Sequence, residues 1–405
     1  MQEAILYRET GWLTRERVNR LSIAAILAYC VGAVVVIATA HGGFDALGIP
    51  LGFDFLAFHG AARLAADGEL AAGFDPYVFT ATLEQQLPGV GYGYFWLYPP
   101  TFALMLAPLA LLSYGAAFWV WTIAGLSVYG GSVWLATRDK TAVLACLGFT
   151  ATWVTAYHGQ NAFYSAALFI AATSFLLKRK EVLAGIAIGL LAFKPHLAVL
   201  FPFALAACSR WRAFGAATAT LLVFSSVSIA AFGWEYLEAY VAHGESLASS
   251  LLADERHWAT ISSLYVAAQL AGAPHAAALA LHVVVAISVS GFVIARIYNY
   301  GATKETLAML VAASLLVSPY VMDYDLAVLA AAGVLLFGTN DRRHATPMDQ
   351  SVGLFIAMIP ILVVGLGRAG IQIGWIAPAL VLMLAEARLR RWDQAPSRRA
   401  ALGAK

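Results

Sequence analysis

Long apolar runs alternate with short polar segments along most of the chain. A helix needs about 20 apolar residues to cross a bilayer, so the first run, 21–40, predicts a membrane-spanning helix. Further spans are predicted at 116–137, 141–157, 162–177, 182–193, 197–208, 213–232, 275–298, 305–319, 325–338, 351–366 and 370–387. The pattern therefore predicts an all-α polytopic membrane protein, a bundle of about twelve transmembrane helices.

Three of the apolar segments depart from this simple pattern. The runs 182–193 and 197–208 are too short for full crossings and meet at 194–196, so we expect two half-deep helices. Such a break is tolerated where protein or water surrounds it. The segment 98–112 is also short and carries Pro99, Pro100 and Pro108. It predicts an interfacial helix on the outer side, or one that dips into the membrane and returns.

Basic residues suggest which loops face the cytoplasm, because Lys and Arg are enriched on that side. If all the basic clusters lie inside, the chain crosses the membrane an even number of times between one cluster and the next. The spans 21–40 and 116–137 already make the pair of crossings before 138–140, so 98–112 does not cross. The predicted regions are an inner segment 1–20, a transmembrane domain 21–387 whose first outer loop is 42–113, and an inner basic tail 388–405 attracted to membrane lipids. The clusters are 138–140, 178–180, 210–212, Arg296 with Lys304, 342–343 and 388–399.

Composition agrees with a membrane protein and excludes several functions. The 405 residues are 12% charged with a mean hydropathy of +0.75, whereas soluble domains carry about 25% charged residues. The net charge of +2, without a basic stripe, argues against a nucleic-acid partner. Cys30, Cys146 and Cys208 fall in apolar runs and predict buried free thiols. No zinc spacing, phosphate-binding glycine loop or serine nucleophile elbow occurs, so we expect no cofactor and no metal.

Asp54 is the first candidate for chemistry. It follows the first span and is flanked by Phe53 and Phe55, which predict an amphipathic interfacial helix. A partly desolvated carboxylate at this place can act as a general base toward a hydroxyl nucleophile, although it can also be an exposed loop residue. His59 and Arg63 follow five and nine residues later, so they need not share its face. His59 is a candidate for substrate binding and Arg63 for phosphate binding.

Lys194 and His196 are candidates for binding an anion. A lysine deep in an apolar stretch is energetically expensive and usually functional, and its point charge suits a phosphate or diphosphate. The alternative is a lysine that snorkels to the interface. His196 either donates to the same phosphate or caps the broken helix.

Two further polar segments are predicted on the outer side. In the turn at 158–161, Gln160 is a candidate for holding sugar hydroxyls, while Asn161 either does the same or caps the next helix. Tyr98, before the proline pair, is a candidate substrate contact. Every long, aromatic or acidic loop is predicted outside, which puts the working face on the outer side of the cytoplasmic (inner) membrane.

The segment 318–325 places two acids and two tyrosines at the outer end of a span, and the sequence leaves their task open. The acids can bind substrate, form a metal-binding pair, or pair with Lys194 and Arg63, and we favour the ion pairs. The candidates here are Tyr320, Asp323, Tyr324 and Asp325.

In their order and spacing, these segments resemble the polyprenyl-phosphate-sugar-dependent glycosyltransferases of family 87, within the GT-C superfamily of membrane enzymes. The resemblance covers roughly residues 50–340. It rests on the Asp54 segment, Ala-Ala-Arg at 61–63, Asp-Pro-Tyr at 75–77, the run 98–108, Gly-Gln-Asn at 159–161, Ala-Gly at 184–185 leading to Lys-Pro at 194–195, and Ser-Pro at 318–319.

This resemblance implies a GT-C-type bundle that transfers a sugar, mannose in type, from a polyprenyl-phosphate-sugar donor to a hydroxyl of a lipid or glycan acceptor. It implies that Asp54 is the general base and that Lys194 faces the donor phosphate. Many members carry a Trp and paired histidines after the Ser-Pro pair. Here the positions hold Met322, Asp323, Tyr324 and Asp325, so no histidine role carries over to them.

The expected reaction is a single displacement at the anomeric carbon with inversion. A lipid or sugar transporter, or a flippase, is the alternative, because it would also use broken helices and buried charge. It would predict internal repeats and polar residues on both sides of the membrane, and the sequence displays neither.

Overall fold

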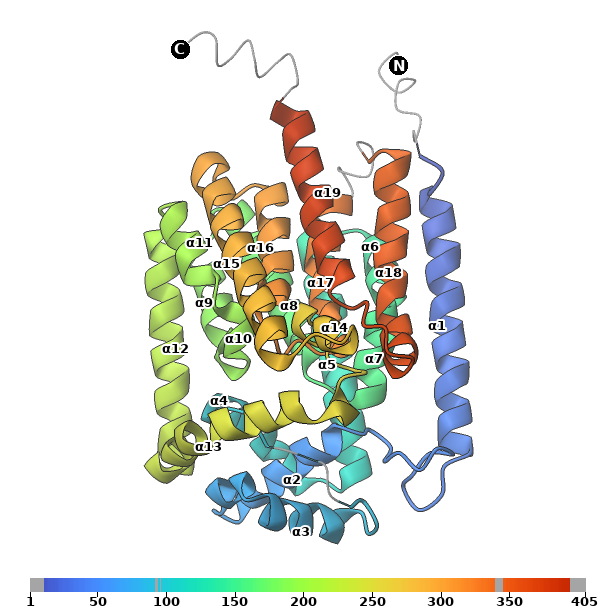
Figure 1. The fold of residues 1–405 in the computed structure, drawn as a ribbon, viewed down its shortest axis with the longest axis vertical. Helices are drawn as coiled ribbons and strands as arrows, with labels where there is room; N and C mark the ends of the chain where they lie inside the picture. The colour runs from blue at the N-terminus through green and yellow to red at the C-terminus, as the bar shows by residue number, and fades with distance from the viewer. Residues whose placement is uncertain (1–10, 92–93, 95, 339–344, 394–405) are drawn as a thin grey trace.

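The computed structural model describes residues 11–91, 94, 96–338 and 345–393, and the regular structure of these residues is helical (Figure 1). In the described part, extended segments pair only through isolated bridges. In chain order the α-helices are α1 Arg15–Ala38, α2 Phe55–Ala66, α3 Pro76–Gln86, α4 Pro100–Leu106, α5 Tyr114–Thr137, α6 Lys140–Leu147, α7 Thr150–His158, α8 Ala162–Leu177, α9 Glu181–Leu190, α10 Pro195–Ala198, α11 Phe201–Ala207, α12 Trp211–Phe232, α13 Trp234–Ala253, α14 Leu264–Leu270, α15 His275–Tyr300, α16 Lys304–Val317, α17 Leu329–Phe337, α18 Pro347–Arg368 and α19 Ile376–Asp393.

Short 3-10 helices continue or connect several of these elements. They are η2 Leu70–Phe74, η3 Ala107–Leu111, η4 Leu191–Phe193, η5 Glu255–His257 and η6 Asp323–Val328. The all-helical prediction is confirmed for the residues that the structure describes.

Several helices have the length and composition to cross a membrane. Within the described ranges five meet both criteria, namely α1, α5, α12, α15 and α18. Their apolar side chains are largely exposed on the outside of the bundle, and only 6% of the apolar window of α1 is buried. By contrast, residues 306–316 of α16 are all buried between neighbouring helices. The chain is therefore a multi-pass membrane protein, and the count of about twelve crossings stays a prediction.

The bundle has two distinct ends. The start of α1 and the end of α19 lie together at one end, which we call the terminal end. At the opposite end, which we call the loop end, α2 and α3 lie below the bundle and α13 runs crosswise (Figure 1). An ion pair between Arg15 Nη2 and Asp139 Oδ1, 2.5 Å long, joins the first turn of α1 to the start of α6 at the terminal end. The basic turn at 138–140 therefore lies on the same side as the start of α1, as the pairing of crossings requires.

The proline-rich segment 98–112 does not traverse the bundle. It forms α4, seven residues long, followed directly by η3, and both pack against α2 at the loop end. Thr101 Oγ1 donates to the carbonyl oxygen of Ala192, 3.0 Å away, which joins α4 to the interrupted helix at η4. The segment is therefore no complete crossing, and whether it lies in the interface or dips into the membrane stays a prediction. The predicted break at 194–196 is also present, because α9 and η4 end there and the short α10 begins.

Three sequence expectations are corrected. The helix after Asp54 is not an amphipathic surface helix, because η2, α3, α4 and η3 cover α2 and leave Phe55 and Phe58 fully buried. The predicted span 141–157 is divided at Gly148, where a Cβ would lie 2.8 Å from the Cα of Ser22, because α1 passes close by. The expectation that all three thiols are buried holds only for Cys146, because Cys30 is exposed on α1 and Cys208 is partly exposed.

Candidate functional site

Polar side chains from five separate segments meet near the loop end of the bundle, and we call this group the polar cluster. They come from the start of α2, the end of α7, the turn before α8, the break after η4 and the 3-10 helix η6. The members are Asp54, His158, Gln160, Asn161, Lys194, Asp323 and Asp325.

Asp54 is the most accessible carboxylate of the polar cluster. It is the residue before the first turn of α2, where the positive end of the helix dipole favours a negative charge. Its Oδ2 accepts a hydrogen bond from Gln160 Nε2 at 2.9 Å and lies 3.2 Å from His158 Nδ1. The side chain is 22% exposed, whereas those of Asp323 and Asp325 are completely buried. A small molecule can therefore reach Asp54 without displacing the core.

Local backbone geometry brings Asp54 and Gln160 together. Gly52 and Phe53 have φ values of 77° and 25°, a conformation that a bulky residue such as Phe53 adopts only under strain. On the other side, Gly159 has a φ of 63°, and a Cβ there would lie 2.5 Å from the Cβ of Phe55. Glycine at 159 therefore allows the turn before α8 to approach the start of α2.

His158 connects two carboxylates. While its Nδ1 faces Asp54, its Nε2 lies 4.0 Å from Asp323 Oδ2. His158 and Asp323 both lie between the predicted spans. Burial alone would lower the pKa of His158, but the carboxylates of Asp323 and Asp54 outweigh that effect and raise it. Burial likewise raises the pKa of Asp323 to about 6, although His158 opposes the shift. The two carboxylates on either side of the ring therefore favour the charged form of the imidazole.

Lys194 is buried and paired. Its ammonium pairs with Asp325 Oδ1, donates to Asn161 Oδ1 at 3.1 Å and lies 4.9 Å from the ring centroid of Tyr324. Because its side chain is only 4% exposed, the snorkelling alternative does not describe it. The predicted pairing with Asp325 is present. The expectation that Arg63 forms an ion pair with one of these acids is wrong, since Arg63 instead donates to the carbonyl oxygen of Ala110 at 3.3 Å.

Several buried polar atoms around Lys194 lack hydrogen-bond partners. Asn161 Nδ2, His196 Nε2 and Asp323 Oδ2 are all buried without one. Native structures leave few such atoms, and each needs a reason, of which an absent ligand is one. Lys194 itself has three N–H donors, and two of them serve Asp325 and Asn161. The region therefore retains capacity to bind a polar molecule.

Other predicted site residues have structural partners elsewhere. His59 holds the segment between α1 and α5 together, because its Nδ1 lies 2.6 Å from Gln86 Oε1 and its Nε2 lies 3.1 Å from the carbonyl oxygen of Leu112. Tyr320 packs beside α14, apart from the polar cluster. The structure therefore does not bring His59, Arg63 or Tyr320 to Asp54.

Tyr98 and Tyr324 do lie at the polar cluster. The Tyr98 hydroxyl lies 3.5 Å from Gln160 Oε1, and the Tyr324 ring packs against both His158 and Lys194. Tyr98 is also held by α13, because the hydroxyl of Tyr236 in that helix donates to the carbonyl oxygen of Tyr98 at 2.7 Å. Both tyrosines can therefore contact a molecule bound beside Asp54.

The sequence analysis did not select two of these residues. His158 appeared only as the start of a polar turn, although it was the titratable group in that turn and could have been noticed for that reason. Tyr236, which also accepts a hydrogen bond from Trp96 Nε1 at 2.7 Å, carries no sequence signal, because its partners lie about 140 residues away.

Among the residues that the structure describes, no group of three or more His, Cys, Asp or Glu side chains is arranged to hold a metal ion. The expectation of a metal-independent reaction stays a prediction.

Comparison with known proteins gives one match. A family model described as glycosyltransferase family 87 matches residues 96–319, more than half of the chain. The matched range contains Gln160, Asn161 and Lys194, whereas Asp54 and Asp323 lie outside it. No curated protein and no solved structure matches the chain.

Proposed function

Because the chain belongs to glycosyltransferase family 87, we propose that it transfers a sugar, mannose in type, from a polyprenyl-phosphate-sugar donor to a hydroxyl of a lipid or glycan acceptor. The observation that carries this proposal is the polar cluster. It combines an accessible carboxylate, Asp54, with a buried cation, Lys194, and with buried hydrogen-bonding atoms that have no protein partner.

In the proposed reaction Asp54 is the general base. The acceptor oxygen forms a bond to the anomeric carbon while its proton passes to the Asp54 carboxylate. The bond between that carbon and the phosphate oxygen breaks, and the electron pair leaves with the phosphate. One displacement inverts the configuration. A base in hydrogen-bonding distance of the hydroxyl contributes about 10²–10⁴ to the rate of such a step.

His158 and Gln160 position the base. Both contact the same oxygen, Asp54 Oδ2, and this leaves Oδ1 directed to the acceptor. Asp323 holds the other side of the imidazole, so the ring cannot rotate freely. A carboxylate held by two donors stays in one orientation, and orientation accounts for a large share of catalysis by proximity.

Lys194 stabilises the leaving phosphate. Its partners Asp325 and Asn161 hold the ammonium in place until the donor arrives, and its third N–H is available for a phosphate oxygen. The unused Nδ2 of Asn161 and Nε2 of His196 add two further donors. Fixed donors in a water-poor site stabilise developing charge strongly, so we propose that the reaction proceeds without a metal.

The test is a transfer assay on the purified protein in lipid vesicles, with labelled polyprenyl-phosphate-mannose and total membrane lipid as the acceptor. We expect a labelled glycolipid to form with wild-type protein and not with Asp54→Asn. Movement of the labelled donor between leaflets, with no product in any acceptor fraction, would instead identify a flippase or transporter.

We also propose that the polar cluster faces the outside of the cytoplasmic membrane, since the basic turn at 138–140 lies at the opposite, terminal end. Lys140 and Asp67 are exposed positions for introduced cysteines at the two ends, in a Cys30→Ser background that removes the exposed native thiol. An impermeant thiol reagent added to intact cells should label Asp67→Cys and leave Lys140→Cys unlabelled. The opposite labelling would reverse the orientation.

A further inference from the structure

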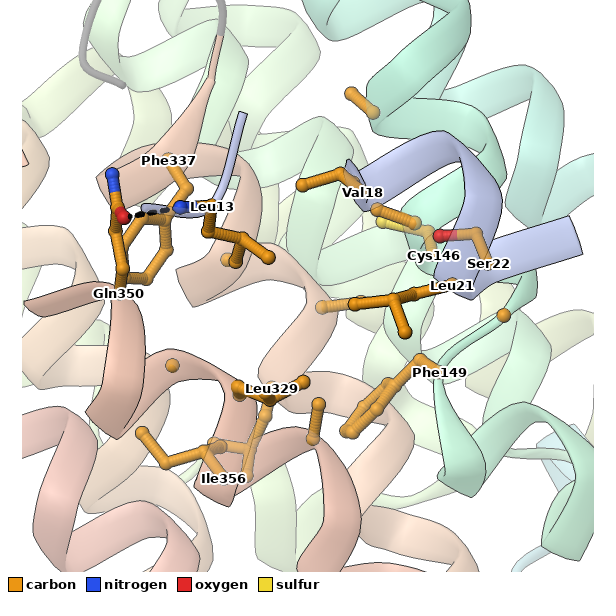
Figure 2. A pocket seen from close by; sticks show the side chains of 18 of the residues that line it. Leu13, Val18, Leu21, Ser22, Cys146, Phe149, Leu329, Phe337, Gln350 and Ile356 are labelled. Atoms are coloured by element: carbon orange, nitrogen blue, oxygen red, sulfur yellow. Dashed lines mark hydrogen bonds between the residues drawn. The ribbon is translucent and has the colours of Figure 1, made fainter. Parts of the chain in front are cut away.

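A large apolar cavity lies at the terminal end, apart from the polar cluster. It encloses about 750 Å³ between α1 on one side and α6, α17 and α18 on the other. Figure 2 shows its walls, with Val18 and Leu21 of α1 near Cys146 on one side and Leu329 and Ile356 below. A volume of this size is in the range of pockets that hold small ligands.

The cavity exists because α1 touches the bundle along one narrow line. α1 packs on α6 and α7, and its closest approach is Ser22 against Gly148, where no Cβ would fit. Beyond this contact, α17 presents Gly333 instead of a larger side chain, and no atom lies within 4 Å of the place where its Cβ would be. A space that is lined by apolar groups does not hold ordered water, so in a bilayer its natural occupant is hydrocarbon.

The shape and the charge of this space select one kind of hydrocarbon. Lining residues on α1 run from Arg15 to Tyr29, about 21 Å along the helix axis, which is longer than one leaflet of a hydrocarbon core about 30 Å thick. At the terminal end, the first six residues of α1 contain three arginines and one glutamate. Arg15 lines the cavity, and its side chain is 52% exposed. Asp139 also lines the cavity and pairs with Arg15, so the three arginines exceed Glu16 and Asp139 by one positive charge. A rim with this excess of positive charge above an apolar shaft matches an anionic headgroup above an acyl chain.

We propose that this cavity binds one acyl chain of an anionic phospholipid, with the headgroup phosphate beside Arg15. The lipid takes the place of protein packing between α1 and the bundle. The binding requires no sugar transfer, so it stands or falls separately from the proposed enzymatic activity.

The test measures lipid that stays bound to the purified full chain. The protein is equilibrated with equal amounts of phosphatidylglycerol and phosphatidylcholine, and native mass spectrometry counts the adducts. We expect one retained phosphatidylglycerol per chain, and a preference over phosphatidylcholine of about fivefold, since one Lys or Arg near a membrane surface contributes about 1 kcal/mol toward anionic lipid.

Two matched glycine variants locate the binding. Gly333→Leu fills the cavity from α17 and should lower retention about tenfold, which corresponds to about 1.4 kcal/mol. Gly365→Leu adds the same side chain at an exposed position of α18 that does not line the cavity, and should retain lipid as wild type does. Ala25→Leu repeats the filling from α1 if Gly333→Leu does not fold. Equal retention by the filled variants and wild type would overturn the proposal.

The headgroup is tested separately. Arg15→Gln is combined with Asp139→Asn so that the buried carboxylate of Asp139 does not lose its partner, and the double variant should lose the preference for phosphatidylglycerol. Equal retention of the two lipids by wild type contradicts the anionic headgroup. Displacement of the retained lipid by a polyprenyl phosphate would identify the donor chain as the occupant and also contradict the proposal.

Discussion

The two ends of the bundle use the same residue types for different purposes. At the terminal end, arginines neutralise the carboxylates: Asp139 pairs with Arg15, and Asp349 lies 3.2 Å from Arg388 and 2.8 Å from Arg391. At the loop end, by contrast, three aspartates share one lysine and one histidine.

This difference separates the carboxylates that join helices through arginine from a carboxylate that has no arginine partner. An arginine is always charged and binds a carboxylate through a planar fork, so a carboxylate that faces arginine is a poor proton acceptor. Asp54 faces an amide and an imidazole instead. It is also 22% exposed, whereas the side chains of Asp139 and Asp349 are buried against arginine.

The largest effect is expected for Asp54→Asn. Asparagine keeps the size and most hydrogen bonds of the side chain but takes no proton, so turnover should fall by about 10²–10⁴ while folding and donor binding are retained. Asp54→Glu should recover little, because the longer side chain displaces the base from the hydroxyl. Turnover and donor binding are measured on the same purified protein. Near-normal turnover of Asp54→Asn would remove Asp54 from the mechanism and direct attention to Asp323.

A smaller effect, on donor binding, is expected for Lys194. Hydrogen bonds to charged groups contribute about 1.5–3 kcal/mol, so Lys194→Ala should weaken donor binding about tenfold to a hundredfold, while Lys194→Arg retains part of it. Lys194→Ala also leaves Asp325 buried without a cation, so the double variant Lys194→Ala with Asp325→Asn is the control for folding. If all the variants bind the donor as wild type does, Lys194 only stabilises the fold.

The smallest effect on turnover is expected at the terminal end. Asp349→Asn removes a buried charge from between two arginines and should lower the free energy of unfolding by about 1–3 kcal/mol. Its activity per folded molecule should equal that of wild type. The comparison uses thermal melting in detergent and the transfer assay side by side. A loss of specific activity as large as that of Asp54→Asn would erase the distinction between the two ends.

Local signals in the sequence account for part of this site. The break at Lys194 was predictable because Pro195 interrupts two runs too short to cross. That 98–112 forms no full-length helix followed from its prolines and from the pairing of basic loops. Charge alone predicted that one of the two acids at 323 and 325 pairs with Lys194, and the structure identifies it as Asp325.

The remainder depends on packing between distant segments. His158 and Asp54 are 104 residues apart, and nothing near either residue in the sequence records their contact. The burial of α2 depends on η2 and α3, which come from a loop without clear periodicity. The break between α6 and α7 depends on the close passage of Ser22.

The pairing of Lys194 with Asp325 also constrains the order in which the protein is made. The two residues are 131 positions apart, and a ribosome adds about 5–20 residues per second, so Lys194 emerges on the order of ten seconds before its counter-charge exists. During that interval the short helices around it cannot settle at their final depth without exposing a bare ammonium to lipid. α1, with its long apolar surface, can enter the bilayer by itself. We therefore expect insertion of the break at Lys194 to be completed late, after η6 has been synthesised.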